Sequence, residues 1–163
     1  MDDKAKKILG DIIIGAKTVK KSEDLVREFK LALNGAGVEI EEVPQAKYFA
    51  AGMNGVEILV LAHESRKNGW WGITEDIVER VQTANARREK GLIWGAAFLD
   101  KSHRRGYWIR GENIFKLKTL GLVTMGGGQY HFKHDDLQRK PDLAPYFWTV
   151  DKFLAHSGLR EPS

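Results

Sequence analysis

Apolar and polar positions alternate along the chain with two different periods, and the change of period marks where helices give way to strands. From Ser22 to Asn34 the apolar residues recur every three or four positions, which predicts an amphipathic helix capped by the serine. Three short runs at 38–43, 48–52 and 58–62 have the composition and turn boundaries of strands. The last run is the most apolar, and we expect it to be the central strand of a sheet.

The second half of the chain predicts further helices and strands. Thr74 caps a helix whose apolar stripe runs to Ala84, and strands follow at 92–99 and 107–110. The remaining predicted elements are a helix at 112–120, a hairpin at 123–132 around Gly126–Gly128, and a terminal helix at 146–154 packed through Phe147, Trp148 and Phe153. Helix, three strands, helix and strand in this order predict an α/β domain with a mixed central sheet flanked by helices.

Residues 68–72 place two tryptophans between glycines, a composition that predicts a loop. In such a pair one ring usually anchors the core and the other is partly exposed, so Trp70 is a candidate stacking surface for nucleic acid. A second polar group, the two histidines and two aspartates between His131 and Asp136, is interpreted as a surface cluster, because a third well-placed ligand set for a metal is missing.

The length of 163 residues fits one domain. We expect a basic N-terminal arm at 1–21, a single α/β domain at 22–155 and a disordered tail at 156–163. The absence of cysteine excludes disulfides and thiolate metal sites. No apolar run approaches the roughly 18 residues that a membrane span needs, and the N-terminus lacks a signal-peptide pattern. These features predict a cytoplasmic protein without a membrane partner.

Basic side chains slightly outnumber acidic ones, with 26 Lys and Arg against 22 Asp and Glu. This excess permits binding to a polyanion such as DNA, and the distribution of charge decides where. Basic residues gather after the central strand, at the end of the second helix, and in the turn 100–106 beside Tyr107 and Trp108. The candidate nucleic-acid contacts are Arg66, Lys67, Trp70, Arg87, Arg88, Lys101, Arg104 and Arg105.

The central strand and its surroundings resemble a known family. Asn54-Gly55-Val56-Glu57-Ile58-Leu59-Val60 leading into Ser65-Arg66-Lys67 resembles the third core strand of archaeal Holliday-junction resolvases. Ile77–Val81, Leu92–Leu99 and the aromatic Tyr107–Ile109 are similar to the family's next helix and strands, so that the likeness covers about residues 22–115. It implies a restriction-endonuclease-like, PD-(D/E)XK fold, a homodimer, and DNA recombination or repair as the setting.

The family's catalytic pattern is largely absent from the corresponding positions. The family cuts DNA with an Asp on the second strand, a Glu-x-Lys on the third and a Glu on the first helix, and the strand acids hold Mg²⁺. Counted from Asn54-Gly55, the strand Asp falls at or near Tyr48, the Glu on Leu61 or Ala62, the Lys on His63 or Glu64, and the helix Glu on Ser22 or Glu23.

Three functions follow from these observations. The first is a non-catalytic, resolvase-like protein without a cofactor or metal, which binds duplex or branched DNA through phosphate contacts as a homodimer. The second is a divergent Mg²⁺-dependent endonuclease or junction resolvase that uses Glu64 and His63 with an acid from elsewhere, such as Glu41 or Glu42. The third is an interaction module that pairs with an active nuclease paralogue or with other recombination or repair proteins.

Overall fold

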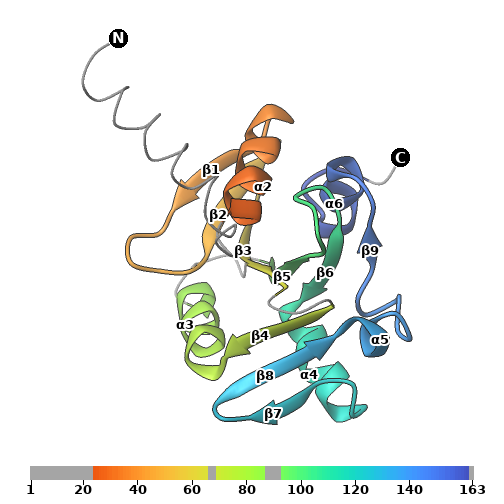
Figure 1. Cartoon of the computed structure of the whole chain (residues 1–163). Helices are drawn as coiled ribbons and strands as arrows, with labels where there is room; N and C mark the ends of the chain where they lie inside the picture. Colours follow the sequence, from red (N-terminus) through yellow and green to blue (C-terminus); the bar gives the residue numbers. More distant parts are fainter. Residues whose placement is uncertain (1–23, 66–68, 87–92, 162–163) are drawn as a thin grey trace, which may run out of the picture.

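A six-stranded mixed sheet forms the centre of the computed structural model, which describes residues 24–65, 69–86 and 93–161 (Figure 1). In sheet order the strands are β1 (Glu39–Glu42), β2 (Phe49–Met53), β3 (Val56–Glu64), β5 (Ile93–Leu99), β6 (Gly106–Arg110) and β9 (Tyr146–Phe147). β3 and β5 run parallel, and all other neighbouring strands are antiparallel. The most apolar predicted strand, β3, therefore lies inside the sheet, and β1 with its three glutamates forms one edge.

Two helices cover one face of this sheet. α2 (Asp24–Gly35) buries Phe29 and Leu33, and α6 (Val150–Ser157) buries Phe153 and Leu154, against the same sheet face. The rings of Phe29 and Phe153 meet edge to face with centroids 5.0 Å apart, which joins the two helices into one layer.

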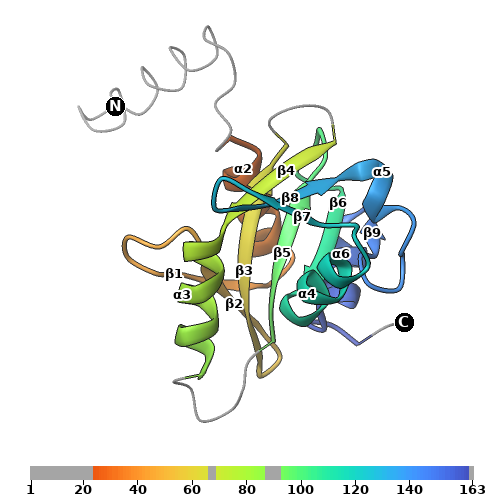
Figure 2. The same cartoon turned by 90° about the horizontal axis from the view of Figure 1, so that it is seen from below.

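A second, three-stranded sheet covers part of the other face, together with three helices. Its strands are β4 (Trp70–Thr74), β8 (Gln129–Lys133) and β7 (Thr124–Gly126), and Figure 2 shows it lying across the strands of the main sheet. The helices are α3 (Glu75–Ala86), α4 (Gly111–Thr119) and the short α5 (His134–Leu137). The fully buried Trp71 ties the two sheets together, because its indole N–H donates to the carbonyl of Leu99 at 3.1 Å.

The predicted fold class is confirmed: a mixed α/β domain with a central sheet flanked by helices. The predicted order of helix, three strands, helix and strand is present as α2, β1 to β3, α3 and β5, with one additional strand, β4, between β3 and α3. Thr74 caps α3 as expected, since its hydroxyl accepts from the N–H of Ile77 at 3.2 Å.

The expectation of a loop around Trp70 and Trp71 is wrong, because residues 70–74 form strand β4. β4 pairs antiparallel with β8, and Trp70 lies opposite Lys133. The flanking glycines favoured a loop, yet only Gly69, with φ of +71°, needs the left-handed backbone. The partner strand lies about 60 residues downstream, so local sequence carries little sign of the pairing.

The predicted helix at 146–154 is also misplaced. Residues 146 and 147 form the edge strand β9, and Thr149 begins α6 by accepting from the N–H of Lys152 at 3.2 Å. Trp148, expected to pack in the core, is 66% exposed because it lies between the strand and the helix.

The folded region extends beyond residue 155, where the sequence predicted the disordered tail to begin. α6 continues to Ser157, Gly158 takes a left-handed φ of +84°, and Leu159 is 1% exposed. The predicted basic arm at 1–21 lies outside the described residues. Within the described ranges, no helix is long and apolar enough to cross a membrane.

Candidate functional site

The carboxyl ends of β3 and β5 meet at one edge of the main sheet, where open α/β sheets commonly place their ligands. His63 lies opposite Phe98 and Glu64 opposite Leu99. β3 is longer than predicted and includes both His63 and Glu64, which the sequence had placed after its end.

The structure does not bring together the three residues of the predicted alternative catalytic site. His63 and Glu64 are consecutive in a strand and so point to opposite faces, and the His63 ring lies 6.2 Å from that of Phe98 on the second-sheet side. Glu42 lies on β1, two strands from β3, and its carboxylate accepts from the ammonium of Lys30 at 2.8 Å. At about 4.8 Å per strand spacing and 3.3 Å per residue, Glu42 is well over 10 Å from Glu64.

Two regions flank this edge of the sheet, and the first is apolar. Phe49 pairs with Val60, and continuing this register places Tyr48 opposite Leu61. Leu61 and Ala62 are 0% and 8% exposed. We call Tyr48, Leu61 and Ala62 the apolar corner.

The resemblance assigns the acids that hold Mg²⁺ to the apolar corner. Mg²⁺ takes carboxylate and other hard oxygen ligands, and Leu61 and Ala62 offer no side-chain oxygen. The residues present therefore do not fit the metal. Across residues 24–65, 69–86 and 93–161, no group of three or more His, Asp or Glu side chains is arranged to hold a metal ion.

The second region is an open pocket of about 660 Å³ between the ends of the two sheets, which we call the polar pocket. Gly69 and Trp70 contribute from the start of β4, and Asp100 and Lys101 from the turn after β5. Lys133, His134 and Asp135 contribute from the end of β8 and the start of α5. Gly69 is required here, because a Cβ on it would lie 2.8 Å from the Cβ of His134, in addition to its positive φ.

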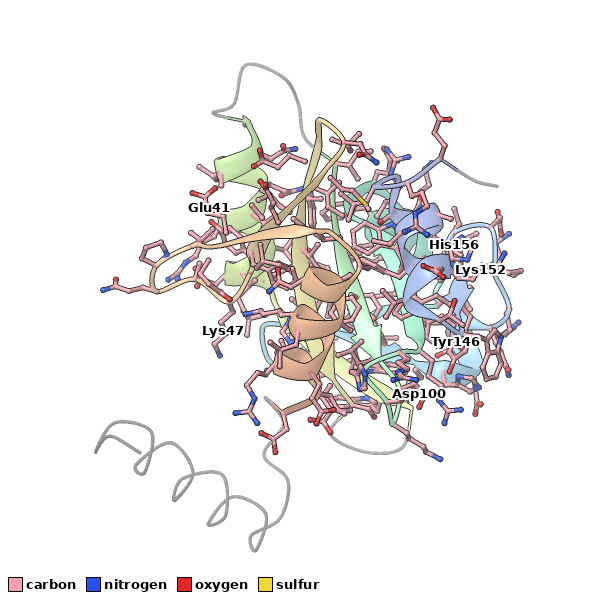
Figure 3. All side chains as sticks on the ribbon, turned by 90° about the horizontal axis from the view of Figure 1, so that it is seen from above. Glu41, Lys47, Asp100, Tyr146, Lys152 and His156 are labelled. Atoms are coloured by element: carbon pink, nitrogen blue, oxygen red, sulfur yellow. The ribbon has the colours of Figure 1, made fainter. Side chains whose placement is uncertain are left out.

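Two tyrosines hydrogen-bond to pocket residues. The hydroxyl of Tyr146 donates to Asp100 Oδ2 at 2.9 Å, and that of Tyr107 lies 2.6 Å from His134 Nδ1. Figure 3 shows Asp100 and Tyr146 on the same side of the molecule. Burial, and then the carboxylates of Asp100 and Asp135, raise the pKa of Tyr107 to about 12. Burial and the bond to Asp100 likewise raise the pKa of Tyr146, so both phenols stay protonated at neutral pH.

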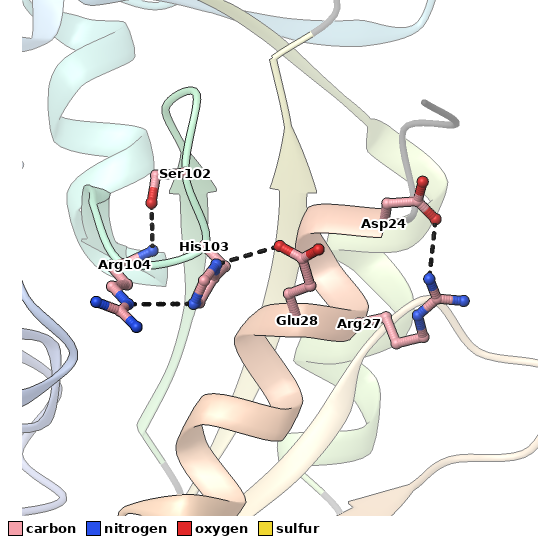
Figure 4. A network of polar contacts seen from close by, with 6 residues as sticks. All are labelled: Asp24, Arg27, Glu28, Ser102, His103 and Arg104. Carbon is pink, nitrogen blue, oxygen red and sulfur yellow. Dashed lines mark hydrogen bonds and ion pairs between the residues drawn. The ribbon is translucent and has the colours of Figure 1, made fainter. Parts of the chain in front are cut away.

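The turn between β5 and β6, residues 100–105, is fixed by several bonds, some of which are drawn in Figure 4. His103 Nδ1 lies 3.2 Å from Glu28 Oε2 on α2, and Arg104 Nε donates to His103 Nε2 at 3.3 Å. A neutral imidazole with its proton on Nδ1 satisfies both contacts. Arg105 Nε donates to the carbonyl of Asp100 at 3.0 Å, which closes the turn. We call residues 100–105 the basic turn.

The basic turn presents its cations at the surface. Lys101 and Arg104 are exposed, and Arg105 lies 5.9 Å from the ring centre of the exposed Trp148. Tyr107 and Trp108, predicted as the aromatic partners of the turn, are not accessible there. They point to opposite faces of β6, and because both faces of the sheet are covered, the two rings are only 2% and 1% exposed. Trp148 is the accessible aromatic beside the turn.

The other predicted nucleic-acid contacts divide into two groups. Trp70 is half-buried, and its ring stacks on His131 with centroids 5.2 Å apart. Arg66, Lys67, Arg87 and Arg88 lie outside the described residues and stay predictions.

Sequence reasoning did not identify Asp100 and Lys133 as site residues, and it treated His134 and Asp135 only as a surface cluster. It considered Trp148 as a packing residue and, under the interaction-module hypothesis, as an exposed interface aromatic, but not as a neighbour of the basic turn. Asp100 had a usable signal, because it directly follows a buried strand that was predicted to lie in the central sheet. The other four become neighbours of the basic turn only through β8, α5 and β9, whose pairings span long separations in sequence.

Comparison with known proteins supports the fold. No protein-family model matches the chain, and no curated protein sequence is detectably similar to it. Among solved structures the chain is similar to Hjc of Archaeoglobus fulgidus, a Holliday junction resolvase from an archaeal hyperthermophile. The match has a TM-score of 0.51 and 13% sequence identity, and covers 71% of this chain and 85% of that chain. The chain thus has a resolvase-like fold of the restriction-endonuclease type.

Proposed function

We propose that this protein binds duplex or branched DNA through phosphate contacts on the basic turn, without metal-dependent cleavage. The observation that carries the proposal is the fixed basic turn at the carboxyl end of β5 in a resolvase-like sheet. Lys101 and Arg104 are exposed there, and Figure 4 shows the tie from the turn to α2. A preordered cationic turn loses little conformational freedom when it meets a phosphate backbone.

The exposed Trp148 strengthens this proposal. Its ring lies beside Arg105 and packs edge to face on Tyr146, with centroids 4.7 Å apart. An aromatic ring held next to a guanidinium is a stacking surface for an unpaired base.

The absence of cleavage is supported by the apolar corner. Its buried Leu61 and Ala62 supply no ligand for a hard cation, and Glu42, His63 and Glu64 lie apart. Incubation with a four-way junction and Mg²⁺ or Mn²⁺ tests this part. Cleavage that Glu64→Gln abolishes would overturn it.

Gel-shift titrations of the full chain with junction, duplex and single-stranded DNA test the binding. Arg104→Gln should weaken binding to every sequence and lower the slope of log K against log salt by about 0.9 for each phosphate contact removed. Lys116→Gln is the matched control, because Lys116 is an exposed cation on α4, at the opposite end of β6 from the turn. Binding that is insensitive to salt would contradict the proposal.

The homodimer implied by the resemblance belongs to the same proposal, and sedimentation at several concentrations tests it. A second candidate function, an interaction module for an active nuclease paralogue or another recombination protein, is favoured by the 66% exposure of Trp148. Trp148→Ser separates the two functions. Loss of DNA affinity assigns the ring to DNA, whereas unchanged DNA affinity with loss of self-association or of nuclease pairing assigns it to a protein interface.

A further inference from the structure

The polar pocket combines three kinds of group. Trp70 supplies a flat aromatic ring, Asp100 and Asp135 supply carboxylate acceptors, and Lys101 and Lys133 supply cations. Within the described ranges neither lysine forms an ion pair. A ligand that satisfies all three kinds of group needs a flat apolar surface, hydrogen-bond donors and an anion.

The geometry places these groups in usable positions. His131 stacks on Trp70 at an interplanar angle of 30°, which fixes the orientation of the indole ring. Lys133 is the cross-strand partner of Trp70, so its side chain leaves the sheet beside the ring. An anion attached to a stacked ligand therefore meets a cation at its edge.

The backbone of Lys101 is a second, independent observation. Its φ is +60°, in the left-handed region that favours glycine or asparagine over lysine. Strained residues of this kind cluster at ligand sites, where the side chain is needed in spite of the strain. Here the strained residue places a cation at the pocket wall.

The size and charge of the pocket exclude two kinds of ligand. A volume of about 660 Å³ suits a small molecule, and a duplex does not fit inside it. A metal ion is disfavoured by the two lysines, and no metal-binding group of side chains occurs in the described part of the chain.

We propose that the polar pocket binds one unpaired nucleotide. Its base lies against Trp70, its exocyclic amino group donates to Asp135 or Asp100, and its phosphate contacts Lys101 and Lys133. The inference extends the proposed DNA contact and rests on it for the source of the nucleotide. In branched DNA that source is a base left unpaired next to the basic turn.

Titration of the full chain with dCMP and dTMP tests the inference. The two nucleotides have similar size and the same phosphate, but cytosine presents an exocyclic amino donor at the position where thymine presents a carbonyl acceptor, and a carboxylate accepts a hydrogen bond only from the former. We expect dCMP to bind roughly five- to tenfold more tightly than dTMP, because one donor–acceptor pair differs.

NMR spectroscopy gives a second readout. The indole N–H resonance of Trp70, assigned with Trp70→Phe, should shift on binding.

Three variants separate the contributions. Asp135→Asn should abolish the preference for dCMP, since an amide also donates to the thymine carbonyl. Trp70→Leu should weaken both nucleotides roughly five- to hundredfold through lost stacking. Lys133→Gln should weaken both equally, and Lys116→Gln outside the pocket should change neither.

Lys101→Gly separates a role of Lys101 in ligand binding from a purely structural role. It removes both the strain and the cation, so it should raise stability and weaken both nucleotides. Gln45→Gly, at another exposed position with a φ of +62° in the loop after β1, should raise stability and leave nucleotide binding unchanged.

The outcomes distinguish the two proposals. If junction DNA binds but dCMP does not shift the Trp70 signal, the pocket inference is wrong and the proposed function stands. If dCMP binds with the expected variant effects but no DNA binds, the proposed function is wrong. If inorganic phosphate binds as tightly as dCMP, the site recognises an anion alone and the inference is overturned.

Discussion

The apolar corner and the polar pocket flank the same end of the main sheet, where the carboxyl ends of β3 and β5 lie. The corner is apolar and closed to solvent, whereas the pocket is lined by charged side chains and open. At the apolar corner, β2 begins beside the end of β3, and Leu61 and Ala62 are closed off from solvent. At the polar pocket, the turn after β5 faces the ends of β4 and β8 across an open space of about 660 Å³. The strand ends are equivalent in topology, so what differs is the packing of their neighbours. Chemistry at a sheet edge therefore depends on where those neighbours leave room for a ligand.

Leu61→Asp is the strongest test of the apolar corner. A carboxylate at this fully buried position would lie within a hydrophobic cluster, so unfolding free energy should fall by about 3–5 kcal/mol. Urea denaturation measures the loss. Tyr48→Asp, at a half-buried position, is the milder companion and should cost less. If Mg²⁺ restored the stability of Leu61→Asp, the corner would accept a metal and the contrast would fail.

The surroundings of the polar pocket should make folding stability depend on pH above pH 10, through Tyr107, which hydrogen-bonds to His134. The pKa of Tyr107 is raised from 10 to about 12 in the fold, so the protein favours the neutral phenol. Stability is unaffected below pH 10 and is lost as pH rises from 10 to 12, by about 2 to 3 kcal/mol for a shift of this size. Thermal unfolding across this range measures it. Tyr107→Phe should flatten the profile, and an unchanged profile in that variant would contradict the assignment.

Lys101→Gly should stabilise the protein by about 1 kcal/mol, because glycine adopts a φ of +60° without the cost that a lysine bears. Gln45→Gly should give a gain of similar size, since its φ is +62°. Melting temperatures compare the two. A gain at Gln45 and a loss at Lys101 would show that the lysine side chain stabilises the fold, rather than being held for a ligand.

His156 gives the smallest expected effect, at the far side of Tyr146 from the pocket. Burial and the charge of Lys152 lower the pKa of His156, so the unfolded chain binds a proton more readily than the fold. Stability is therefore complete above pH 6.5 and falls slightly as pH drops below it. His156→Gln should remove this part of the acid slope, which denaturation at pH 7 and pH 5 detects. If stability fell more steeply between pH 7 and pH 5 in the variant than in the unchanged protein, the pKa of His156 would be raised in the fold rather than lowered.

The sequence predicted the main sheet well because its signals are local. The apolar run at 58–62, the turn at Asn54-Gly55 and the cap at Thr74 each act within a few residues. β4 was missed because its partner strand β8 lies far along the chain. β9 was missed because a strand of two residues is too short to show an alternation of apolar and polar positions. Adjacent aromatics at 146–148 matched a helix face equally well, so the exposure of Trp148 could not be read from them.

The candidate site was predicted only in part for the same reason. Lys101, Arg104 and Arg105 were found because they lie close together along the chain, within one predicted turn. The polar pocket needs Trp70, Asp100 and His134 to converge from three distant segments. His63 and Glu64 were expected to act together, but strand geometry turns neighbouring residues apart.

The acidic edge strand β1 bears on whether copies of this protein can pair edge to edge. A sheet edge offers unpaired backbone groups on which a strand from another molecule can add. Here Glu39, Glu41 and Glu42 line that edge, and Figure 3 shows Glu41 on the side of the molecule opposite Asp100 and Tyr146. Two such edges would bring like charges face to face. Pairing of copies through β1 is therefore disfavoured, and the negative charge of this strand lies away from the basic turn.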